Sequence, residues 1–300
     1  NSFCTLLELG MTSTLRVLVL HGHGMSGELM RSKLGFLRSE TKKTVAWTCL
    51  DGPIAMTPTE VAATLTARRA AMAAASTEKD GDQPPASPST ATDRPSGADQ
   101  SPTSPAAAEE PTVYSWFNFN GKRDDGTPAY QGVAEAMAAI DAAAAKDGPF
   151  DGVFGFSQGA VIAAMWIARQ QRALLGMPLP EGTVVPQREH PLRFGVFCSG
   201  LLPSDPVETG LVTGIPAAAT PIATAHCYGE TDEVITPERS EALRNIALFT
   251  APPAVAMPAV THPGGHAVAG GLRKPLKAFL VARHAEVYPP AAPAAGKKQK

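Results

Sequence analysis

The sequence lacks several features that would place it in a specialised class of protein. Acidic and basic residues nearly cancel, leaving a formal net charge of −2, so we expect no nucleic-acid partner. The only basic run is the tail 297–300, which is more typical of a solvated chain end than of a binding element. No apolar stretch has the length of a secretory core or a membrane span, so we expect neither. Because the chain begins with Asn, a lost targeting segment stays open.

Cysteine is scarce, with four residues in the chain. Cys4, Cys49, Cys198 and Cys227 form no C-x-x-C pair, so their spacing indicates neither a zinc site nor a redox pair. The last three lie in or beside apolar runs and are interpreted as small buried residues. We therefore expect no metal and a reducing, cytoplasmic location.

Apolar sequence is abundant, at 44 % of the 300 residues, which is enough for a sizeable core. One segment, 76–112, instead holds many Pro, Ser, Thr and Asp residues and almost nothing apolar. Such a segment cannot bury enough surface to offset its chain entropy. We interpret it as a disordered insertion in a single domain over 14–288, followed by a disordered tail at 289–300.

Short apolar strands alternate with helical patterns along the rest of the chain. They show almost no in–out alternation, as expected when both faces of a parallel sheet are covered. The pattern predicts an α/β fold with helices on both faces of a mostly parallel sheet. Strands are expected at 15–20, 44–50, 152–156, 193–198 and 222–228, and helices at 59–75, 132–146, 158–175, 237–247 and 269–285.

The first strand ends in Gly22-His23-Gly24-Met25-Ser26-Gly27, a G-x-G-x-x-G run, with Asp51 a little over twenty residues further on. This spacing matches a dinucleotide-binding fingerprint and leaves open a nucleotide-dependent oxidoreductase. The alternative is a turn that presents a backbone N–H to a reacting carbonyl.

The expected strand at 152–156 runs directly into the sequence Gly155-Phe156-Ser157-Gln158-Gly159, and a helix follows at once. G-x-S-x-G is the nucleophile-elbow pattern, in which glycines let a sharp strand-to-helix turn present the serine hydroxyl at the top of the sheet. Ser157 is therefore a candidate nucleophile. A glycine-rich turn with no catalytic role is the alternative.

A serine nucleophile needs a base and an acid that orients the base, in the chain order Ser, Asp or Glu, His in this architecture. Asp232 follows the strand at 222–228 and is preferred over Glu230 and Glu233, because apolar sequence resumes directly after it. His266, near the start of the last helix, is preferred over His262, which is expected to be structural.

Taken together, "VLVLHGHGMSG", "PFDGVFGFSQGA", "FCSGLLP", "HCYGETDEVITP" and "HPGGHAV" come in the order found in the FSH family of serine hydrolases. The chain resembles this family over about 14–284. The resemblance implies an α/β-hydrolase fold, a triad of Ser157, Asp232 and His266, and hydrolysis of carboxylic esters or thioesters without a cofactor. A small-molecule acyl ester or thioester is thus the expected partner, and the oligomeric state stays open.

The same resemblance places an aromatic segment near the acyl pocket, where Trp116 and Phe117 would bind substrate. Ordinary core packing is an equally good interpretation of these two residues. In the implied mechanism, backbone N–H groups of Gln158 and His23 form the oxyanion hole. An inactive hydrolase-fold binding module remains a second alternative, since a sequence does not show that the three side chains meet.

Overall fold

The structure is a computed structural model that describes residues 14–77, 112–183, 185, 192–216, 222–249 and 259–289, without the side chains of 68–77. Most of the predicted insertion and tail lies outside these residues. The chain divides into two compact units, 56–113 and the remainder. The single domain over 14–288 stays a prediction.

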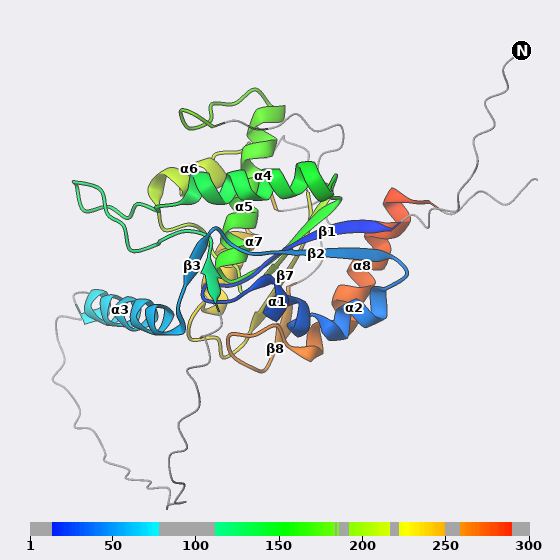
Figure 1. The fold of residues 1–300 in the computed structure, drawn as a ribbon, viewed down its shortest axis with the longest axis horizontal. Coiled ribbons are helices and arrows are strands. Elements are labelled where there is room, and N and C mark those ends of the chain that lie inside the picture. The colour runs from blue at the N-terminus through cyan, green and yellow to red at the C-terminus, as the bar shows by residue number, and fades with distance from the viewer. Residues whose placement is uncertain are drawn as a thin grey trace, which may run out of the picture. The chain divides into compact units, whose positions relative to one another are not determined.

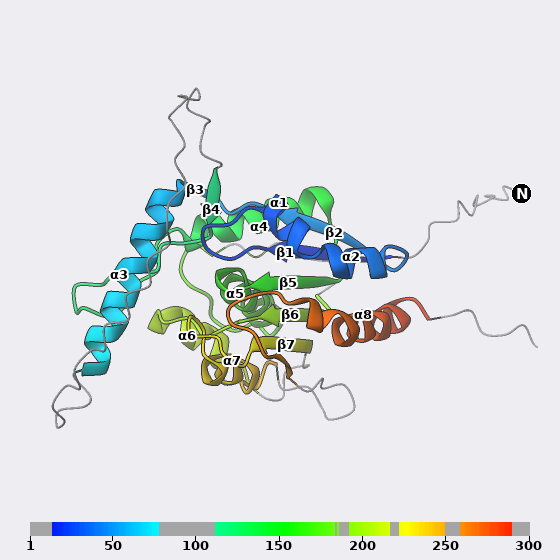
Figure 2. The ribbon, with the colours of Figure 1, turned by 90° about the horizontal axis from the view of Figure 1, so that it is seen from below.

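The larger unit is built on one parallel sheet. Its strands follow one another in the order β2-β1-β5-β6-β7-β8, and every neighbouring pair is parallel. Figure 2 shows the first five in this order from top to bottom. In the described residues these strands are β1 (Leu15–Leu20), β2 (Val45–Leu50), β5 (Gly152–Phe156), β6 (Phe194–Cys198), β7 (Ala223–Gly229) and β8 (Val260–His262).

Helices cover both faces of this sheet, as the apolar strands predict (Figure 1). Leu18 and Leu20 of β1 pack into one core cluster with residues of four helices, while Val17 and Val19 pack into another with residues of three. The first set is α4 (Val133–Asp147), α5 (Gln158–Leu174), α6 (Pro206–Thr213) and α7 (Pro237–Arg244). The second set is α1 (Gly27–Lys33), α2 (Gly35–Thr41) and α8 (Arg273–Val287).

Some elements differ from the prediction or were not predicted. The expected helix at 269–285 begins instead as a 3-10 turn, η1 (Gly270–Leu272), and becomes α8 only at Arg273. The pair Gly270-Gly271 explains the late start, because glycine is a poor α-helix former. The prediction also missed α1, α2 and α6, the strand β8, and the two-stranded sheet of β3 (Ile54–Met56) and β4 (Val113–Ser115).

The smaller unit contains the helix α3 (Pro58–Thr77), predicted at 59–75. A capping box begins it: Thr57 Oγ1 accepts from the Glu60 amide, and a Glu60 carboxylate oxygen accepts from the Thr57 amide. No helix among the described residues is long and apolar enough to span a membrane.

Candidate active site

Ser157 occupies the sharp turn between β5 and α5. Its backbone has a positive φ, with φ 54° and ψ −118°, a conformation that few residues other than glycine adopt. The Ser157 amide donates to the carbonyl of Cys198 at the end of β6, at 2.9 Å. The turn therefore holds the serine at the carboxyl end of the sheet, where ligands bind in folds of this type.

The glycines on either side of this turn are required by close backbone contacts. A Cβ on Gly155 would lie 2.4 Å from the Gly159 carbonyl oxygen, and a Cβ on Gly159 would lie 2.1 Å from the Leu20 carbonyl oxygen. No real Cβ makes contacts this short. The G-x-S-x-G spacing is thus explained by the fit of α5 against β1 and β5.

His266 brings its ring between the other two candidate residues. Its Nε2 lies 2.9 Å from Ser157 Oγ, and its Nδ1 lies 2.8 Å from Asp232 Oδ2. The ring packs on Phe156, with ring centroids 4.9 Å apart. The structure thus brings together three side chains that are 109 and 34 positions apart in sequence.

Asp232 is 2 % exposed and lies between β7 and α7. One carboxylate oxygen accepts from the amides of Val234 and Ile235, at 3.0 and 2.8 Å, and the other from His266 and from the Ser199 hydroxyl. Burial by itself would raise the pKa of Asp232, but these hydrogen bonds outweigh it and lower the pKa. The carboxyl is therefore ionised at neutral pH.

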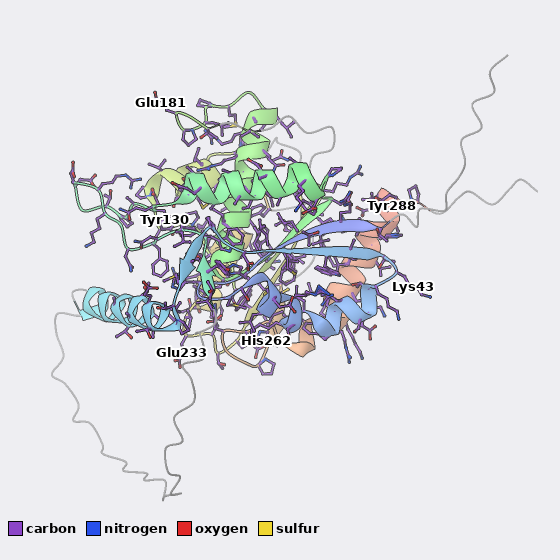
Figure 3. All side chains as sticks on the ribbon, viewed as in Figure 1. Lys43, Tyr130, Glu181, Glu233, His262 and Tyr288 are labelled. Atoms are coloured by element: carbon purple, nitrogen blue, oxygen red, sulfur yellow. The ribbon has the colours of Figure 1, made fainter. Side chains whose placement is uncertain are left out.

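The rival residues occupy other positions. Glu230 and Glu233 are exposed, and Glu230 accepts from Thr261. His262 is buried at the end of β8, where its Nδ1 accepts from the Gly264 amide and its Nε2 lies 3.1 Å from the Ala267 carbonyl oxygen. Figure 3 labels Glu233, which follows β7, and His262, which ends β8.

The loops that carry Asp232 and His266 are fastened to each other. The Glu230 amide donates to the His262 carbonyl at 2.8 Å, and the Thr231 amide reaches the Gly264 carbonyl at 3.4 Å. A Cβ on Gly229 would lie 2.0 Å from that same carbonyl oxygen, so the close approach depends on glycine. This bracing fixes the acid and the imidazole relative to each other.

His23 and Gln158 are linked through Ser115. The hydroxyl of Ser115 lies 3.0 Å from His23 Nδ1 and 2.9 Å from Gln158 Oε1. The Gln158 side chain is buried and also binds the Trp116 amide and the Phe117 carbonyl. The first loop and the start of α5 are thus held side by side.

Trp116 and Phe117 lie in the core, at 0 % and 2 % exposure. Trp116 Nε1 donates to the His21 carbonyl at 2.8 Å, and Phe117 stacks on Tyr130 with ring centroids 4.4 Å apart. Of the two interpretations left open by the sequence, this placement favours core packing over substrate contact.

The G-x-G-x-x-G loop uses its amides within the protein. The Gly24 amide donates to the Tyr114 carbonyl at 2.9 Å, and the Gly27 amide donates to Asp51 Oδ1 at 2.6 Å. A dinucleotide fingerprint would need such amides for a pyrophosphate and the acidic residue for a ribose. Here Asp51 instead holds the start of α1, which favours the turn over the nucleotide site.

Ser199, which was not singled out from the sequence, contacts the same carboxylate. It directly follows β6, is fully buried, and its Oγ lies 2.9 Å from Asp232 Oδ2. The available signal was its position in "FCSGLLP", directly after a strand as Ser157 is. Among the described residues, no group of three or more His, Cys, Asp or Glu side chains could hold a metal ion.

Comparison with known proteins identifies the family. The model of the serine hydrolase (FSH1) family matches residues 11–269. Esterase OVCA2 of Bos taurus is 30 % identical over 255 residues, which cover 84 % of this chain and 88 % of that protein. Esterase OVCA2 of Mus musculus is 29 % identical over 256 residues, covering 84 % and 88 %.

Solved structures agree on the fold. Acyl-protein thioesterase 2 of Zea mays has a TM-score of 0.53 at 16 % identity, over 91 % of this chain and 94 % of that one. SOBER1 of Arabidopsis thaliana has a TM-score of 0.51 at 16 % identity, over 90 % and 99 %. The chain therefore has the α/β-hydrolase fold and belongs to the serine hydrolase (FSH1) family.

Proposed function

We propose that this protein is an esterase or thioesterase that cleaves acyl esters through an acyl-enzyme intermediate, with Ser157, His266 and Asp232 as its catalytic triad. One observation carries the proposal: His266 contacts the Ser157 hydroxyl and the Asp232 carboxylate at once, at 2.9 and 2.8 Å. This is the arrangement that lets a serine act as a nucleophile.

The chemistry would proceed in two acyl-transfer steps. His266 Nε2 takes the proton of Ser157 as Oγ attacks the carbonyl carbon, and then gives it to the leaving alcohol or thiol. Water, deprotonated by the same imidazole, attacks the acyl-serine and releases the carboxylic acid. The buried, ionised Asp232 keeps the Nδ1–H tautomer and stabilises the imidazolium.

Two backbone amides would bind the oxyanion, those of Gln158 and His23. Gln158 is the first residue of α5, so its N–H has no acceptor within the helix and lies at the positive end of the helix dipole. The side chains of His23 and Gln158 both contact the Ser115 hydroxyl, which holds the two residues near each other. Removal of one such donor typically costs roughly 3–4 kcal/mol of transition-state stabilisation.

The substrate class is inferred from the relatives. Relatives similar in sequence are named esterases, and one similar structure is an acyl-protein thioesterase. The proposal therefore includes both carboxylic esters and thioesters. It also places the enzyme in the cytoplasm. There the free, buried thiols of Cys198 and Cys227, which are neighbours in the register of β6 and β7, would stay reduced.

The test is hydrolysis of p-nitrophenyl esters of increasing acyl length, with an acyl-coenzyme A series alongside. Wild-type protein should release product, and Ser157→Ala and His266→Gln should lower kcat by about 10⁴-fold or more. Ser240→Ala, which changes a buried serine on α7, is the matched control and should keep its activity. Equal hydrolysis by wild type and Ser157→Ala would exclude the triad, and no hydrolysis of either series would favour the inactive binding module.

A further inference from the structure

Ser199 follows the neighbouring strand with a positive φ, as Ser157 follows β5. Among the described residues, these two serines are the only residues other than glycine with positive φ, at 54° and 45°. Each directly follows a strand, and Phe156 and Cys198, the residues before them, are partners in the sheet register. Each serine amide also donates to a carbonyl of the next strand, Ser157 to Cys198 of β6 and Ser199 to Cys227 of β7.

A strained conformation persists only where its surroundings hold it, and such residues gather at functional sites. At Ser157 the turn presents the hydroxyl that His266 contacts. At Ser199 the turn directs a fully buried hydroxyl to Asp232 Oδ2, at 2.9 Å. The two turns thus position the first and the last hydroxyl of one hydrogen-bonded series, which runs from Ser157 through His266 and Asp232 to Ser199.

The direction of the Ser199 hydrogen bond follows from the chemistry of its partner. An ionised carboxylate only accepts, so the Ser199 hydroxyl donates. Asp232 Oδ1 accepts two amides, and Oδ2 accepts Ser199 and His266. Every acceptor position of the carboxylate is therefore filled, and within the described part of the chain Ser199 is the one side-chain donor besides His266.

We propose that Ser199 is a positioning residue of this enzyme: its hydroxyl fixes the rotation of the Asp232 carboxylate and shares its charge. The inference rests on the proposed function, because it concerns the acid of the proposed triad. Without this donor, only the two amide bonds to Oδ1 would resist rotation of Oδ2 away from His266 Nδ1, and the imidazole would be oriented less firmly. The negative charge on Oδ2, no longer shared with the Ser199 hydroxyl, would then interact more strongly with the imidazolium of His266.

Two variants test the hydroxyl separately from the backbone. Ser199→Ala removes the hydroxyl and keeps a side chain at this positive φ. Ser199→Gly removes the hydroxyl but adopts that conformation freely. The control is Ser240→Ala, a serine of α7 with similar burial at 2 % exposure, whose hydroxyl has no hydrogen-bond partner among the described residues.

Steady-state kinetics with a p-nitrophenyl ester are measured as a function of pH. Both Ser199 variants should lower kcat by about 10-fold or more, as expected for loss of a hydrogen bond to a charged group, with KM within about two-fold. The acid limb of kcat/KM should move to higher pH, because a carboxylate with one donor fewer holds the imidazolium proton more tightly. The titratable groups around the pair are His266, in contact with Asp232, the flanking Glu230 and Glu233, and the thiols Cys198 and Cys227 behind Ser199.

Wild-type kcat and an unshifted acid limb in both variants would overturn the inference. So would wild-type kcat in Ser199→Gly alone, because then only the backbone conformation would matter. A wild-type protein with no ester or thioester hydrolysis would instead remove the proposed function itself. Circular dichroism of both variants shows whether the fold is retained, and Ser199→Gly keeps the test valid if the alanine variant is unstable.

Discussion

Replacing Gly159 by alanine should damage both stability and catalysis, because this residue is where α5 touches β1. A Cβ at this position would lie 2.1 Å from the Leu20 carbonyl oxygen and 2.5 Å from that of His21. Ordinary van der Waals contact begins at 3.4 Å, so the helix and the strand must separate by about 1 Å. Both neighbours are backbone atoms of buried residues, which cannot move aside as a flexible side chain would.

The magnitude follows from this geometry. Overpacking of a buried contact typically costs about 1–3 kcal/mol of folding free energy, and a clash with two carbonyl groups puts Gly159→Ala at the upper end, about 3 kcal/mol. The displaced element carries Ser157 and the Gln158 amide at its start. A misplacement of about 1 Å at a reacting group lowers the rate by about 10²-fold.

Urea unfolding followed by circular dichroism measures the stability, and p-nitrophenyl ester hydrolysis measures kcat. Gly35→Ala is the matched control, because a Cβ at this first residue of α2 meets no atom within 4 Å. The control should keep wild-type stability and kcat. Wild-type stability and kcat in Gly159→Ala would refute the packing explanation of the elbow glycines.

Three further predictions concern single buried groups. Asp232→Asn should lower kcat by about 10⁴-fold with little change in the circular dichroism spectrum, since it favours the wrong imidazole tautomer; kcat within ten-fold of wild type would contradict this. Burial lowers the pKa of His226 to about 3, so stability present above the unfolded value near 6.5 is lost as the pH falls towards 3. At pH 5 this loss is about 2 kcal/mol, and the urea-unfolding free energy of His226→Leu should fall less between pH 7 and 5 than that of wild type; equal falls would contradict it. Glu208→Ala should cost about 3–5 kcal/mol in the same assay, because it leaves the Arg169 guanidinium, 2.8 Å from Glu208, buried without its carboxylate; a loss below 1 kcal/mol would contradict it.

The central sheet could be predicted because its strands are short apolar runs buried on both faces. The five predicted strands begin and end within one residue of β1, β2, β5, β6 and β7. The missed elements are short. α1 and α2 have seven residues each, and β8 has three, too few for a periodic pattern to emerge. Their conformation is set by packing, as when Asp51 holds the start of α1.

Part of the candidate site could likewise be predicted from the sequence, and part could not. The order Ser157, Asp232, His266 could be read from motifs that follow strands, and the structure brings these residues into contact. Ser199 also follows a strand, but no motif indicates that a second serine contacts the acid, and the contact with Asp232 is seen only once β6 pairs with β7. For Trp116 and Phe117 the sequence left substrate contact and core packing equally open, and their burial favours core packing.

The most direct test of the account is covalent labelling by a fluorophosphonate probe, with the adduct located by peptide mass spectrometry. The account predicts one stoichiometric adduct on Ser157, absent in Ser157→Ala and formed much more slowly in His266→Gln. Both variants should keep the wild-type circular dichroism spectrum, so that loss of labelling reports chemistry and not unfolding. An unlabelled Ser157 in a protein that hydrolyses esters, or equal labelling rates in wild type and His266→Gln, would contradict the assignment of Ser157 as a nucleophile activated by His266.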